Sequence, residues 1–185
     1  EILIGLVGSE MCIRDRRGRA HVGRSESRYA DLLYDFRASE GLAQYPNANS
    51  TMRLTYGNVQ PLNPSDGVHY DSRSTIAGYM EKYNPDEYEY RVDDRMRRLI
   101  AKRDWGRWGE NGTLYVNFLT DNDITGGNSG SPVLDGRGHL IGLAFDGNRE
   151  SMAGDVWFHP ELARTVCVDI RYVMWVIDKL SLIHI

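Results

Sequence analysis

Residues 125–132 read TGGNSGSP, which places a serine between glycines. A serine hydroxyl attacks a carbonyl carbon only if a base takes its proton and nearby donors stabilise the resulting oxyanion. Backbone N–H groups can act as these donors, but aiming two of them at one point requires backbone angles that glycine permits. The pattern favours Ser129 as a nucleophile, with the N–H groups of Gly127 and Ser129 forming an oxyanion hole.

Anion binding and a plain surface turn are the alternative interpretations of this loop. A phosphate-binding loop normally opens a helix and carries a lysine, whereas a β-hairpin follows here and no lysine is near. The hydrolase nucleophile elbow joins a strand to a helix, so strands on both sides argue against it. The setting fits a chymotrypsin-like double barrel, whose nucleophile lies late in the chain.

The segments around the loop predict a mostly β domain that closes with a helix. Two apolar runs within 132–145 are joined by Asp135-Gly136-Arg137-Gly138, a hairpin signal. In 51–57, Met52, Leu54 and Tyr56 alternate with polar residues, which predicts a strand with its apolar face buried. Periodicity predicts further strands at 113–119 and 164–170, a turn-rich stretch at 63–67, and helices at 28–43, 89–103 and 171–180.

Composition excludes several functional classes. The 185 residues carry a formal net charge of -4, which provides no basic field for nucleic acid. No apolar run approaches the length of a membrane span. Two cysteines and five histidines show no metal-ligand spacing, so we expect neither a metal nor a cofactor.

Both ends of the chain look foreign. Residues 1–16 and 181–185 resemble translated sequencing adapters, and we expect them to be non-native. A signal peptide is the alternative for the first segment, but its apolar run is short and has no leading positive charge. On this interpretation the chain is a fragment, and a boundary at residue 46 divides a segment at 17–45 with helical spacing from a mostly β domain at 46–180.

Longer stretches resemble the family S46 dipeptidyl peptidases, bacterial serine exopeptidases with a chymotrypsin-like double barrel. The resemblance is carried by NFLTDNDITGGNSGSPVLDGRGHLIGLAFDGN at 117–148 and PELARTVCVDIRYVMWVIDK at 160–179, and upstream by YPNANSTMRLTYGNVQ and AKRDWGRW. It implies that residues 46–180 are the C-terminal β-barrel of a double barrel and carry the nucleophile, and that residues 17–45 are an N-terminal remnant, the tail of a helical domain. It also implies that Ser129 is the nucleophile and that Gly127 and Ser129 form the oxyanion hole.

The same resemblance implies two substrate-binding positions. Asp146 matches the carboxylate that binds the free α-amine of the substrate, although the residues alone favour a plain turn at 146–148. Gly147 matches the position that sets the first specificity pocket, where an arginine selects acidic side chains. Glycine there implies an apolar or aromatic preference, as in the dipeptidyl peptidase 7 type. Arg149 departs from the usual tryptophan, which weakens this implication. Asn128 stands where activated trypsin-like enzymes carry an aspartate.

The histidine and aspartate that would complete a triad with Ser129 are not assigned. Family members carry them in the first barrel, and His69, His139 and His159 lie in no motif that suggests a base. We therefore expect this chain alone to be inactive. The resemblance implies a homodimeric parent in the periplasm or at the cell surface that acts on peptides with free N-termini. A non-catalytic β-barrel for binding or assembly and a trypsin-like serine endopeptidase remain the alternatives.

Overall fold

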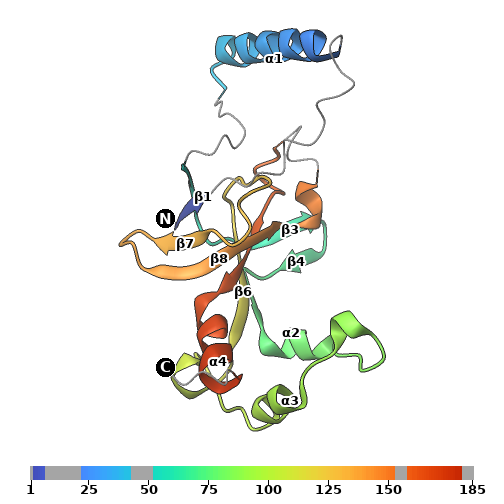
Figure 1. Ribbon diagram of the computed structural model, residues 1–185, viewed down its shortest axis with the longest axis vertical. Coiled ribbons are helices and arrows are strands. Elements are labelled where there is room, and N and C mark those ends of the chain that lie inside the picture. The colour runs from blue at the N-terminus through green and yellow to red at the C-terminus, as the bar shows by residue number, and fades with distance from the viewer. Residues whose placement is uncertain (1, 7–21, 43–51, 153–157, 181–185) are drawn as a thin grey trace. The chain divides into compact units, whose positions relative to one another are not determined.

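A computed structural model describes residues 2–6, 22–42, 52–152 and 158–180 (Figure 1). The helix α1 belongs to one compact unit, and β1 with the described residues from 52 onward belongs to another. The predicted boundary at residue 46 and the segment 181–185 lie outside the described residues. The elements are β1 (Ile2–Leu6), α1 (Val22–Ser39), β2 (Arg53–Gly57), β3 (Leu62–Ser65), β4 (Val68–Tyr70), β5 (Arg73–Thr75), α2 (Ile76–Glu81), η1 (Tyr88–Tyr90), α3 (Asp94–Ala101), η2 (Gly106–Trp108), β6 (Tyr115–Thr120), β7 (Pro132–Asp135), β8 (Leu140–Gly147), η3 (Arg149–Ser151), β9 (Thr165–Asp169) and α4 (Ile170–Leu180).

Seven strands form one antiparallel sheet in the order β2-β1-β7-β8-β9-β6-β5, and β3 pairs with β4 in a separate hairpin. A bridge between Val59 and Thr120 joins the segment after β2 to the end of β6. The pairings from β2 through β9 to β6 therefore return to their starting segment, as they do in a closed barrel. The predicted mostly β fold with a closing C-terminal helix is confirmed, and its chymotrypsin-like character stays a prediction. That residues 1–16 are foreign also stays a prediction, because the pairing of β1 does not test it.

Two hydrophobic cores meet on β6. Val116 packs into a core shared with α2, α3 and α4, which includes Met96 and Trp175. Two residues further along, Phe118 packs into the core of the sheet with Cys167 and its neighbours. Because side chains two apart lie on one face of a strand, a single face of β6 serves both cores. In Figure 1 the yellow β6 runs from the sheet toward the helices.

The strand at 51–57 forms as predicted, but its predicted orientation is wrong. Leu54 and Tyr56 are 56% and 71% exposed, whereas Arg53 and Thr55 are half-buried. The physical reason is that no described element covers the apolar face of β2. Alternation shows that a strand has two faces, but it does not show which face another element covers.

Other predicted elements are confirmed with changed limits. The predicted helix at 89–103 is α3, which begins at Asp94 because the Asp93 carboxylate caps the N–H groups of Arg95 and Met96. The helix predicted at 28–43 begins earlier and ends at Ser39. The turn-rich stretch at 63–67 is the β3–β4 hairpin, and the six-residue helix α2 was not predicted from the sequence.

Candidate active site

Asn128 organises the loop between β6 and β7. This side chain is only 1% exposed, and its Oδ1 accepts a hydrogen bond from the Thr125 N–H at 3.0 Å. The Asn128 N–H donates back to the Thr125 carbonyl at 3.2 Å, and the Ser131 N–H donates to the Asn128 carbonyl at 2.9 Å. The loop is therefore closed on itself around a neutral amide, and this local role requires no ionic partner.

The glycines on either side of Ser129 adopt conformations that other residues avoid. Gly127 has φ +103° and Gly130 has φ +82°, both in the left-handed region that favours glycine. The Gly130 N–H donates to the Ala144 carbonyl at 2.7 Å, which ties the loop to β8. Within the described part of the chain, the N–H groups of Gly127 and Ser129 are not used in hydrogen bonds. Their convergence on one oxyanion stays a prediction.

Ser129 is exposed, and its hydroxyl donates to the Phe145 carbonyl at 3.3 Å. None of the three described histidines, His69, His139 and His159, lines the cavity beside this serine. His139 lies in the hairpin turn, 3.0 Å from Asp135. The hydrogen bond from its backbone N–H lowers the pKa of Asp135. His139 is therefore part of the hydrogen bonding of the hairpin turn. The base that would activate Ser129 and the aspartate that would orient this base remain unassigned.

A β-bulge in β8 places Asp146. The register pairs Ala144 with Cys167 and Asp146 with Val166, so Phe145 is the additional residue. Without the bulge, residues 144 and 146 would share one face of the strand. Instead Ala144 is buried, whereas Phe145 and Asp146 are both exposed, as expected where a bulge redirects a side chain. The Asp146 Oδ1 accepts from the Gly147 N–H at 2.8 Å.

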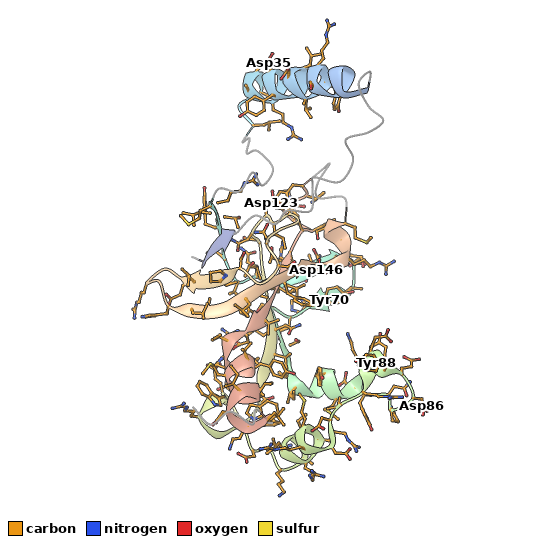
Figure 2. All side chains as sticks on the ribbon, viewed as in Figure 1. Asp35, Tyr70, Asp86, Tyr88, Asp123 and Asp146 are labelled. Carbon is orange, nitrogen blue, oxygen red and sulfur yellow. The ribbon has the colours of Figure 1, made fainter. Side chains whose placement is uncertain are left out.

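A cavity of about 250 Å³ brings together most of the predicted site residues. Ser129, Asp146 and Gly147 line it, and Gly127 does not. Arg149 is exposed and lies outside this lining. Figure 2 labels Asp146 on β8 and Asp123 in the loop that precedes Ser129. The apolar part of the lining consists of Ile124, Phe145, Met152, Phe158 and Ala163.

Several polar residues of this cavity were not predicted from the sequence, among them Asp123, Asn148, Ser151 and Arg164. Arg164 is buried, and its guanidinium donates to backbone carbonyls, including that of Pro61 at 3.1 Å. No signal in the local sequence could have found it, because Pro61 lies 103 residues away. Asp123 lies within the quoted 117–148 stretch but has no motif of its own.

Asn148 holds the turn that follows Asp146 and Gly147. Its Nδ2 donates to the Leu162 carbonyl at 2.8 Å and to Glu150 Oε2 at 2.7 Å. Its Oδ1 accepts from the Arg164 N–H at 2.7 Å, and its own N–H donates to the Arg164 carbonyl at 2.9 Å. This turn beside the cavity, the pocket turn, is therefore attached to the segment before β9 by both backbone and side-chain hydrogen bonds.

No group of three or more His, Cys, Asp or Glu side chains among the described residues is placed to hold a metal ion. No helix in the ranges that the structure covers is both long and apolar enough to cross a membrane.

Known relatives cover most of this chain. The chain is 54% identical over 137 residues to dipeptidyl-peptidase 7 of Phocaeicola vulgatus, which covers 74% of this chain and 19% of that protein. It is 48% identical over 136 residues to the Asp/Glu-specific dipeptidyl-peptidase of Capnocytophaga gingivalis, covering 73% of this chain and 19% of the relative. The crystal structure of Porphyromonas endodontalis DPP11 with the dipeptide Arg-Glu matches with a TM-score of 0.73 and 41% identity, over 82% of this chain and 22% of that one.

The chain thus spans about a fifth of the length of these curated relatives. The family model for peptidase S46 matches residues 10–182, which include the loop around Ser129 and the bulged strand with Asp146. We conclude that this chain belongs to the peptidase S46 family.

Proposed function

We propose that the parent of this chain releases dipeptides from the N-termini of peptides through an acyl-enzyme at Ser129. The observation that carries the proposal is that Ser129 and Asp146 line one cavity. The Ser129 hydroxyl reaches the carbonyl of Phe145, the residue directly before Asp146. The Ser129 hydroxyl therefore lies beside the end of β8 that carries the exposed Asp146 carboxylate. Dipeptidyl peptidase names among the relatives support the same activity.

The proposed reaction is acyl transfer. A base supplied by the parent removes the Ser129 Oγ proton while Oγ attacks the carbonyl carbon of the second substrate residue. The N–H groups of Gly127 and Ser129 stabilise the oxyanion. The peptide C–N bond then breaks, and the leaving amine takes the proton from the base. Water hydrolyses the ester and releases the dipeptide, which regenerates the Ser129 hydroxyl.

Asp146 would determine the length of the product. A substrate α-ammonium held by this carboxylate fixes where the chain starts, and two extended residues span roughly 7 Å. Such an anchor positions the second carbonyl for attack and rejects substrates that lack a free amine. The redirected side chain at the bulge supports this role, because a buried Asp146 could not meet an incoming peptide.

The proposed preference is for apolar or aromatic residues at the second position. Gly147 contributes no charge to the cavity, and Ile124, Met152 and Phe158 contribute apolar lining. Arg149 lies outside the lining and is exposed, so it need not oppose this preference. In the parent, a first barrel would supply the histidine and aspartate. Export to the periplasm or cell surface and dimerisation complete the proposal.

The test uses the full-length parent and fluorogenic dipeptidyl substrates. The wild type should cleave substrates that have a free amine, and Ser129→Ala should abolish cleavage. Asp146→Asn should reduce kcat/KM by about 10- to 100-fold, because a hydrogen bond to a charged group contributes roughly 1.5–3 kcal/mol. The matched control is Asp86→Asn, an exposed aspartate outside the cavity, which should leave the rate unchanged.

The two alternatives give different results in the same assay. A trypsin-like endopeptidase would cleave amine-blocked substrates as fast as free ones. A non-catalytic β-barrel for binding or assembly would give no cleavage by the wild type. Either result would overturn the proposed function.

A further inference from the structure

Space, and not backbone conformation, explains the glycine at position 147. Gly147 is absent from the glycines with positive φ, so its backbone suits any residue. An added Cβ would lie well inside 3.0 Å of the Ser151 hydroxyl oxygen, closer than real Cβ contacts come. The Ser151 Cβ would be 3.6 Å away, an ordinary contact. A single oxygen atom therefore occupies the space that a side chain at 147 would need.

Hydrogen bonds hold that oxygen in place. The Ser151 Oγ donates to the Asn148 carbonyl at 2.8 Å, and the Ser151 N–H donates to the same carbonyl at 3.1 Å. Asn148 is in turn anchored to Leu162 and Arg164. The hydroxyl can rotate away only by giving up its bond to the carbonyl. The side chain is half-buried and lines the same cavity as Ser129.

We propose that Ser151 is a second specificity-determining residue, which acts together with Gly147. Its hydroxyl fills the space next to Gly147, so this pair forms the cavity wall that meets the second substrate residue. Which side chains are tolerated at position 147 therefore depends on the residue at position 151. This inference rests on the proposed function, because the cavity is taken to hold the substrate side chain.

A double-mutant cycle on the full-length parent tests the pairing. Gly147→Ala should lower kcat/KM by about tenfold, mainly through KM, since a misfit of one methyl-sized group in a pocket changes kcat/KM by roughly 10- to 200-fold. The loss should be greater for a phenylalanine than for an alanine at the second substrate position. Adding Ser151→Ala removes the oxygen and leaves only the ordinary Cβ contact. The double variant should therefore recover to within about threefold of Ser151→Ala alone, a non-additive result.

Gly78→Ala is the matched control for a glycine-to-alanine change, because a Cβ there meets no atom within 4 Å. Its kinetics should equal those of the wild type. A double variant no better than Gly147→Ala, or an equal loss for both substrates, overturns the role of Ser151. Absence of dipeptide release by the wild type instead overturns the proposed function. In that case thermal unfolding of this chain still tests the pairing, because Ser151→Ala should restore the melting temperature that Gly147→Ala lowers.

Discussion

Replacing Asn148 by alanine tests whether the pocket turn depends on this one side chain. The substitution removes its bonds to the Leu162 carbonyl, the Glu150 carboxylate and the Arg164 N–H. It leaves intact the backbone bond from the residue 148 N–H to the Arg164 carbonyl. The turn should therefore loosen without losing all contact with the segment before β9.

The expected loss of stability depends on how each hydrogen-bond partner of Asn148 is left after the substitution. The Leu162 carbonyl loses one neutral hydrogen bond, a loss of about 1 kcal/mol, and the N–H of buried Arg164 is left without an acceptor, which costs about 1–3 kcal/mol. Glu150 is half-buried and can bond to water, so we assign it nothing. The free energy of unfolding should fall by about 2–4 kcal/mol. A fall of 3 kcal/mol corresponds to about 6–12 °C in Tm for a chain of this size.

Urea unfolding followed by tryptophan fluorescence measures this change, since Trp105 and Trp175 are buried. The urea midpoint should fall while the slope stays constant, because the exposed surface of the unfolded chain is unchanged. Asn63→Ala is the control: this exposed amide bonds only His69 among the described residues, so we expect a change within about 0.5 kcal/mol. An Asn148→Ala value within that same range would refute the reasoning.

The remaining predictions concern the sheet. An added Cβ at Gly142 would lie 2.6 Å from Phe118 Cε1 and from the Val168 carbonyl oxygen. Gly142→Ala should therefore lower the free energy of unfolding by about 3 kcal/mol. An unchanged urea midpoint would contradict this prediction. Burial raises the pKa of the Cys167 thiol to about 12, so in a Cys12→Ser background the folded chain should resist thiol labelling at pH 8. An unfolded thiol ionises near pH 8.5, so stability should fall as pH rises from about 8.5 toward 12. Rapid labelling of the folded chain would show that the thiol is accessible.

Local patterns predicted those features whose causes are local. The β7–β8 hairpin follows from Asp135 to Gly138, where Gly138 has φ +83°. The tight loop around Ser129 follows from glycines whose backbone angles other residues avoid. The closing helix α4 follows from apolar residues at helical spacing.

Features that depend on distant partners could not be predicted. Asn148 gains its role from carbonyl and N–H groups 14 and 16 residues later, so its own neighbourhood indicates only a turn. The bulge at Phe145 is a mismatch with β9 and leaves no local signal. Burial of the two faces of β2 depends on which elements cover them, and the alternation of Leu54 and Tyr56 cannot show that.

Because β6 contributes side chains to both hydrophobic cores, it has a consequence for the cooperativity of unfolding. Val116 and Phe118 lie on one face of β6 and enter different cores. Unfolding of either core would therefore disrupt the strand on which the other core depends. The helices and the sheet should therefore unfold in one transition, and a truncation that removes α4 should unfold the sheet as well. The loop around Ser129, which is attached to β8, would lose its geometry in the same step.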